Sequence, residues 1–231
     1  MNYKYEDFLH DYDGEEDYFG REDELAFVYT LDKAYSGDVE YMRVLGDIYS
    51  SRGYGVKTDY GKAIFWYGKA GDCGDNNSVV RLADLLSRCD KVPKDYERAF
   101  LLYELAAEEG GELAAARLGA MYYYGYGCER DVDEARKWLK IGAESGEREA
   151  CYLYAHILKD EGADGWKNFL FKSASQSYGK AAWELACELL ADENADKKLV
   201  KMYLNIAAYD EENLGVDERA RAQHMLEKYF K

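Results

Sequence analysis

The chain has 231 residues, 48% of them hydrophobic, which is enough to bury a substantial core. Its 46 acidic and 30 basic residues give a formal net charge of −16, so phosphates of nucleic acid and anionic lipid should be repelled and neither is expected as a direct partner. One proline and no sustained alternation of apolar and polar residues predict an all-α protein.

The first 22 residues are predicted to form an acidic arm that precedes a helical domain at 23–231. Residues 1–24 hold ten acidic and two basic residues, with aromatic residues between them. This composition fits either a linker or a segment that docks on its own domain or on a partner, and the sequence leaves both open. The arm begins without an apolar stretch, so we expect no signal peptide.

Five acids of the arm have the spacing of the ligands in an EF-hand calcium loop: Asp11, Asp13, Glu15, Asp17 and Glu22. Glu16 occupies the position at which such a loop turns on glycine. A solvated acidic arm is therefore favoured over a calcium site.

Cysteine usage indicates a reducing compartment. The five cysteines are irregularly spaced and form no C-x-x-C pair, which predicts neither a zinc site nor a redox motif; they are Cys73, Cys89, Cys128, Cys151 and Cys187. We expect buried free thiols and a cytoplasmic protein. No apolar run approaches the roughly 18–20 residues that span a bilayer.

An internal repeat starts at residue 37. Turn residues recur at intervals of 37, 36, 36 and 31 residues, and eight residues after each comes a large residue followed by a small one. These pairs are Leu45-Gly46, Leu82-Ala83, Leu118-Gly119, Tyr154-Ala155 and Leu185-Ala186. A large–small pair at a fixed phase suits close helix packing, and it predicts a first helix in each repeat near 38–51, 76–88, 112–124, 148–159 and 178–191.

A second helix in each repeat is predicted from alanines at 63, 99 and 135, each followed three residues later by a large residue. Trp66 and Trp138 share this phase, so both are predicted to be buried between repeats. Asp59 and Asp131 follow glycine-containing turns and are suited to cap the second helix. Residues 23–36 resemble a lone second helix, and residues 217–230 are predicted to be a capping helix.

The stretch from Leu45-Gly46 through Gly53-Tyr54-Gly55 to Trp66-Tyr67 resembles a Sel-one-like repeat, a relative of the tetratricopeptide repeat. The stretch from Leu118 to Trp138 is similar to it as well. About five copies cover residues 38–209, and the second lacks the G-x-G turn. The resemblance implies a right-handed α-α superhelix, a solenoid of antiparallel helix pairs that holds other proteins together.

Catalytic and cofactor chemistry find little support in the sequence. The three histidines, His10, His156 and His224, lie in different parts of the chain, and the G-x-G turns follow helices and lack the Lys-Ser/Thr of a phosphate loop. No cofactor, metal or enzymatic activity is predicted. Secreted relatives of this repeat family that bind or hydrolyse β-lactams have paired cysteines in each repeat, which this chain lacks.

A protein-interaction scaffold is therefore the predicted function, and an inhibitor or immunity-type protein that neutralises a basic effector is one concrete form of it. An acidic nucleic-acid mimic is the alternative, because the negative surface would fit a nucleic-acid-binding cleft.

The partner is expected in a concave groove lined by the first helix of each repeat, since the resemblance places those helices on the inner surface. Positions opposite the core face of those helices give the candidate residues Arg43, Asp47, Arg81, Asp84, Arg117, Tyr152, His156, Trp183 and Glu184. The arginines either receive an acidic segment, with an apolar anchor near Tyr152 and Trp183, or pair with acids on adjacent helices.

Overall fold

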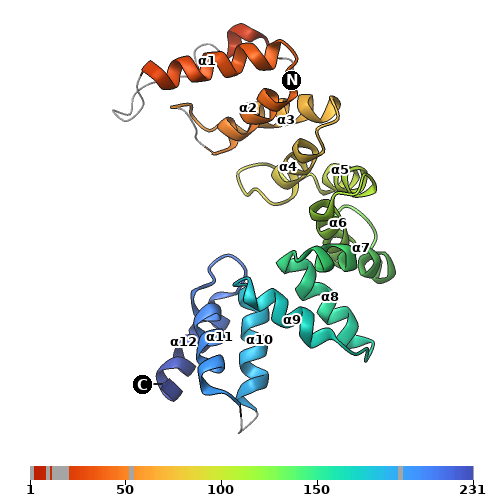
Figure 1. Ribbon diagram of the computed structural model, residues 1–231, viewed down its shortest axis with the longest axis vertical. Coiled ribbons are helices and arrows are strands. Elements are labelled where there is room, and N and C mark those ends of the chain that lie inside the picture. Colours follow the sequence, from red (N-terminus) through yellow and green to blue (C-terminus); the bar gives the residue numbers. More distant parts are fainter. Residues whose placement is uncertain (1–2, 9–10, 12–20, 52–54, 192–194, 231) are drawn as a thin grey trace. The chain divides into compact units, whose positions relative to one another are not determined.

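A computed structural model describes residues 3–8, 11, 21–51, 55–191 and 195–230 (Figure 1). Within these residues the chain is all-helical, as predicted, and has no β-strand. A short 3-10 helix, η1, spans Tyr5–Asp7. The α-helices are α1 (Arg21–Tyr35), α2 (Val39–Ser51), α3 (Tyr60–Asp72), α4 (Asn76–Ser87), α5 (Tyr96–Glu108), α6 (Glu112–Tyr124), α7 (Val132–Ser145), α8 (Arg148–Asp160), α9 (Trp166–Ser175), α10 (Gly179–Leu190), α11 (Lys197–Tyr209) and α12 (Val216–Phe230).

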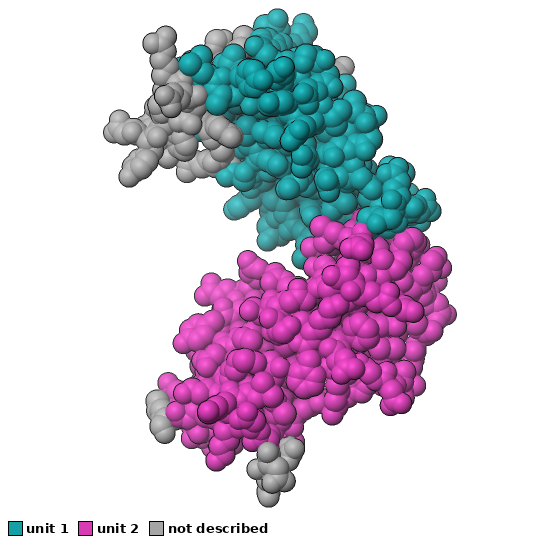
Figure 2. All heavy atoms as spheres, in the orientation of Figure 1, with its two compact units in different colours: residues 1–111 teal, residues 112–231 magenta. Residues whose placement is uncertain are grey.

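The chain forms two compact units, residues 1–111 and 112–231 (Figure 2). Within each unit, helices pack mainly on those next to them in the sequence, in the series α1 to α5 and α6 to α12. This neighbour-to-neighbour packing is what a helical repeat protein requires, because one helix pair cannot cover its own apolar face. None of the described helices is long and apolar enough to cross a membrane.

The first helices of the repeats are α2, α4, α6, α8 and α10, close to their predicted bounds. The large residue of every large–small pair is at most 8% exposed, and its small neighbour is buried beside it. At Gly46 a Cβ atom would lie 2.4 Å from the ring of Tyr67, and at Gly119 it would lie 2.7 Å from Leu139. The small residue is therefore what lets the paired helices approach each other.

The second helices α3, α5 and α7 each begin at an aspartate cap. Asp59, Asp95 and Asp131 accept hydrogen bonds of 3.0–3.1 Å from the backbone N–H three residues later. Two of these caps, Asp59 and Asp131, were predicted. At the other end of the chain, α12 lies against α11, as predicted for a capping helix.

The prediction for the repeat tryptophans is right for Trp66 and wrong for Trp138. Trp66 is 2% exposed because Phe8 and Tyr35, both from outside its repeat, pack on its ring at 5.3 Å. Trp138 is only half-buried: its indole N–H donates to Glu134 at 3.1 Å. The largest fully buried side chain of α7 is instead that of the next residue, Leu139.

The expectation of buried thiols holds for one cysteine. Cys151 is buried, and burial raises the pKa of its thiol to about 11. Cys89 and Cys128 are half-buried, whereas Cys73 and Cys187 are exposed. All five are free thiols.

Candidate functional site

The arginines predicted to line the groove are paired with acids. On α2, Arg43 Nε lies 3.6 Å from the carboxylate of Asp75, which caps α4. On α4, Arg81 lies 3.2 Å from Asp47. Within the first unit, therefore, the predicted residues of α2 and α4 pair with acids on each other's repeat, which was the second of the two sequence-based alternatives.

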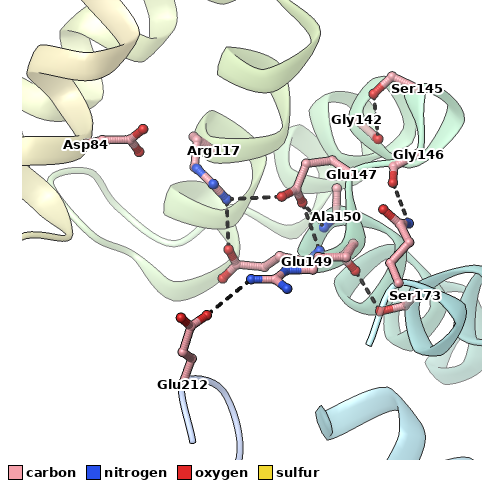
Figure 3. A network of polar contacts seen from close by, with 12 residues as sticks. Asp84, Arg117, Gly142, Ser145, Gly146, Glu147, Glu149, Ala150, Ser173 and Glu212 are labelled. Atoms are coloured by element: carbon pink, nitrogen blue, oxygen red, sulfur yellow. Dashed lines mark hydrogen bonds and ion pairs between the residues drawn. The ribbon is translucent and has the colours of Figure 1, made fainter. Parts of the chain in front are cut away.

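Arg117 on α6 makes the most buried of these pairs (Figure 3). Its guanidinium lies 3.0 Å from Glu149 and 3.5 Å from Glu147, and all three side chains are less than 20% exposed. Glu147 also caps α8 through the backbone N–H of Ala150 at 3.0 Å. Arg117 thus joins α6 to the start of α8, and its charge is balanced by two carboxylates.

Asp47 and Asp84 have a structural role that the sequence reasoning missed. Tyr67 donates to Asp47 at 2.6 Å, and Tyr103 donates to Asp84 at 2.7 Å. A serine completes each cluster at 3.1 Å from the tyrosine hydroxyl; these are Ser50 and Ser87. The signal was present in the sequence, because aspartate, serine and tyrosine recur at matching positions of the first two repeats.

The aromatic end of the predicted groove forms one hydrogen-bonded cluster between α8 and α10. Glu184 accepts from the hydroxyl of Tyr152 at 2.9 Å and lies 2.9 Å from Nε2 of His156. Burial, and then the charge of Glu184, raise the pKa of Tyr152 well above its usual value. Burial alone would raise the pKa of Glu184, but hydrogen bonds and charge from His156 and Tyr152 hold that pKa below its usual value.

A cleft of about 410 Å³ opens beside this cluster. Its walls come from α8, α10, α12 and the loop before α12, and they comprise Tyr152, Lys180, Trp183, Glu184, Leu214, Gly215 and Glu218. The structure thus brings Tyr152, Trp183 and Glu184 together around one hollow. The sequence reasoning missed the other four. Lys180 lies on the same face of α10 as Trp183 and Glu184 but was not chosen, and Leu214, Gly215 and Glu218 come from outside the repeats.

A second cleft, of about 540 Å³, lies on the other part of the same α11–α12 loop. Its lining comprises Arg148, Ser177, Ile206, Tyr209, Asp210, Glu211, Glu212 and Asn213. Asp210 is fixed here, since it accepts from the backbone N–H of Gly179 at 2.5 Å, and Arg148 lies 3.4 Å from Glu212. Tyr209 is 75% exposed at its rim. The loop is therefore shared by two acidic, aromatic clefts.

The described part of the acidic arm docks on α1, α2 and α3. Phe8 is fully buried among aromatic rings, with centroids 5.3 Å from Trp66 and 6.0 Å from both Tyr49 and Phe65. Asp11 forms an ion pair of 2.5 Å with Lys62. Of the two alternatives for the arm, residues 3–8 and 11 therefore follow the docking one. The other acids with EF-hand spacing, Asp13, Glu15 and Asp17, lie outside the described residues, and of Glu22 only the backbone is described.

The family model for the Sel1 repeat matches residues 39–75, 80–111 and 113–147. These three matches begin near α2, α4 and α6 and each includes the following second helix. The chain contains three Sel1 repeats.

Known proteins similar to this chain agree with that assignment. The ERAD-associated E3 ubiquitin-protein ligase component HRD3A of Arabidopsis thaliana is 33% identical over 103 residues, which cover 39% of this chain and 15% of that protein. A Sel1 repeat protein from Oxalobacter formigenes has a similar structure, with a TM-score of 0.68 at 23% identity over 86% of this chain and 60% of the other.

Immunity protein Pa5087 from Pseudomonas aeruginosa has the same type of fold, with a TM-score of 0.52 at 17% identity, covering 100% of this chain and 89% of the other. The chain spans less than a fifth of the length of HRD3A and about three fifths of the Oxalobacter protein. These likenesses show that the chain has the helical-repeat fold of its relatives.

Proposed function

We propose that this chain is a non-enzymatic scaffold that binds another protein through the cleft at Tyr152, Trp183 and Glu184. The observation that carries the proposal is the meeting of these three side chains around one hollow of the second unit. All three belong to the face of the first helices that the sequence predicts to bind a partner. The cleft therefore gives the predicted binding face a defined docking point.

The lining of this cleft suits a side chain of a partner protein. Trp183 and the buried Leu214 offer apolar surface, while Lys180, Glu184 and Glu218 offer charged groups. Tyr152 and Glu184 are held in place by their mutual hydrogen bond, so they lose little freedom on binding. Tryptophan and tyrosine beside such a hollow are the residue types that anchor protein interfaces.

A basic partner fits the electrostatics better than an acidic one. Arg43, Arg81 and Arg117 are already paired with carboxylates, so they offer little net positive charge to an acidic segment. The loop shared by the two clefts carries Glu211 and Glu212, whose side chains lie 3.7 Å from Arg219 and 3.4 Å from Arg148 but are still 85% and 80% exposed. With a net charge of −16, the chain should attract a basic protein at a high association rate. Neutralising a basic effector, as an inhibitor or immunity-type protein, is the concrete form of this proposal.

A peptide-display selection tests the proposal and does not require that the partner be identified first. A random library is selected on the full chain, with no prior depletion on any variant, and every enriched peptide is then measured on the variant Trp183→Ala. We expect enriched peptides that combine Lys or Arg with an apolar residue, and whose affinity for Trp183→Ala is roughly tenfold lower, which corresponds to about 1.4 kcal/mol.

The matched control is Trp138→Ala, which removes a half-exposed tryptophan of α7 that does not line the cleft. Enriched peptides should bind this control like the parent. Enrichment of acidic peptides whose binding requires Arg43 or Arg81 would show that the partner docks on the face that carries these arginines and not in the cleft. Peptides that bind Trp183→Ala and the parent equally would refute the cleft as the docking point.

A further inference from the structure

The outward face of α5 carries two exposed leucines one turn apart. Leu101 is 61% exposed and Leu105 is 50% exposed. The buried residues of α5, Ala99, Tyr103, Ala106 and Ala107, lie on the opposite side of the helix. The leucines therefore contribute little to the core of the first unit, and their burial would favour association with something else.

Three glutamates border the leucines on one side of this face of α5, and the exposed Arg98 lies on the other side. At 100° per residue, Glu97, Glu104 and Glu108 fall within roughly 60° of Leu101. The face thus presents an apolar pair bordered by three carboxylates and one guanidinium, which leaves an excess of negative charge. Such a pattern complements a segment that has apolar residues flanked by Lys or Arg.

The matching face of α3 shows that this part of a second helix can receive an added segment. The caps Asp59 and Asp95 align α3 with α5, and this alignment places Phe65 at the position of Leu101. Phe65 is covered by Tyr3 and Phe8 of the N-terminal segment, with ring centroids 5.3 and 6.0 Å away. The equivalent residue of α7 is the charged Lys137.

We propose that the outward face of α5, defined by Glu97, Leu101, Glu104, Leu105 and Glu108, is a second docking surface that binds a basic amphipathic segment of a partner protein. The charge pattern selects this occupant. A second copy of the chain would bring its own excess of acids against these three glutamates, and the N-terminal segment is itself acidic.

The test uses a labelled helical peptide of about 14 residues with leucines one turn apart and lysines around them, and a second peptide with glutamates in place of the lysines. Fluorescence anisotropy at physiological salt measures both against the full chain, since weak long-range attraction is screened there. We expect the lysine peptide to bind and the glutamate peptide not to bind.

Two variants connect the binding to this surface. Leu101→Ser combined with Leu105→Ser should lower the affinity for the lysine peptide roughly tenfold without lowering the melting temperature. Ile141→Ser, on the exposed face of α7, should change neither the affinity nor the melting temperature. Glu97→Lys, Glu104→Lys and Glu108→Lys together should transfer binding to the glutamate peptide. The proposal would be overturned if the leucine substitutions left the affinity for the lysine peptide unchanged. It would also be overturned if the parent chain formed a dimer that these substitutions abolished, because the occupant would then be a second copy of the chain.

This surface and the cleft of the second unit are tested separately. Trp183→Ala should leave the lysine peptide bound to α5, and the leucine variant should still bind the peptides selected on the cleft. Loss of only one of the two interactions would therefore show which of the two proposals has failed.

Discussion

The hydroxyl of Tyr49 donates a hydrogen bond of 2.6 Å to the carboxylate of Asp11, 38 residues earlier in the chain. Burial, followed by this hydrogen bond, raises the pKa of Tyr49 far above its usual value. Lys62 completes the contact by pairing with the same carboxylate. This polar contact fixes the N-terminal segment to the first unit, and the buried Phe8 side chain adds an apolar contact from the same segment.

Phe8→Ala should lower the free energy of unfolding by roughly 3–5 kcal/mol, because it empties a fully buried aromatic site. Urea denaturation followed by circular dichroism measures the change. Phe171→Ala is the matched control: its ring is 36% exposed, so the same chemical change should cost about 1 kcal/mol or less. A loss for Phe8→Ala of about 1 kcal/mol or less would show that the docked N-terminal segment contributes little to the stability of the fold.

The ion pair between Asp11 and Lys62 should show coupling in a double-mutant cycle. The two side chains are 20% and 11% exposed, so removing one leaves the other poorly solvated. Asp11→Ala and Lys62→Ala should each cost about 2–3 kcal/mol, and the double variant should cost about 1 kcal/mol less than their sum. Strict additivity in urea titrations would show that the pair is not energetically coupled.

The two repeat tryptophans should differ in their energetic weight. Trp66→Ala removes a side chain 2% exposed and should cost roughly 3–5 kcal/mol. Trp138→Ala removes a half-exposed ring and should cost about 1–2 kcal/mol. Thermal denaturation of both variants gives the comparison, and a larger loss for Trp138 would contradict the packing described here.

The positions of the helices were predictable because the large–small pairs, such as Leu45-Gly46, mark the points at which the two helices of a repeat pack closely against each other. The exposure of Trp138 was not predictable from the repeat. Trp66 occupies the same repeat position but is buried by Phe8, a residue outside the repeats, and among the described residues Trp138 has no such cover from the N-terminal segment. A repeat phase describes what neighbouring repeats do to each other. It contains no information about a segment added from outside.

The same distinction applies to the candidate site. Tyr152, Trp183 and Glu184 were found from helix periodicity, and they line one cleft. Lys180 and Glu218 were missed. Lys180 lies on the same face of α10 as Trp183 and Glu184 but was not chosen, and Glu218 comes from α12, outside the repeats. The pairing of Arg43 with Asp75 was also undetermined by sequence, because side-chain partners depend on how adjacent helices are aligned.

The pH dependence of stability should report on Glu184. Its pKa in the folded protein lies below the usual value of 4.5, so the unfolded chain takes up a proton first as the pH falls. Its contribution is therefore present above about pH 4.5 and is lost as the pH drops through the lower, folded-state pKa. Glu184→Gln should cost about 1 kcal/mol at pH 6 and much less at pH 3.

The control for this measurement is Glu188→Gln on the same helix, where the carboxylate pairs with Lys159 and Lys167 at the surface. Its effect should be about 0.5 kcal/mol or less. If the cost of Glu184→Gln were the same at pH 3 and pH 6, the hydrogen bonds of its neutral form, and not its charge, would hold the cluster together.

Substituting two glycines should distinguish the effect of close helix packing on stability from the effect of helix propensity. At Gly46 an added methyl group would lie 2.4 Å from the ring of Tyr67, and that ring cannot move away because Asp47 and Ser50 hold its hydroxyl. Gly46→Ala should therefore cost about 2–3 kcal/mol or more. At Gly68 on α3 an added methyl group meets no atom within 4 Å, so Gly68→Ala should stabilise the protein by about 0.5–1 kcal/mol through its higher helix propensity. Urea titrations of the two variants should shift in opposite directions, and a stabilising Gly46→Ala would show that α2 and α3 are not packed as closely as this structure has them.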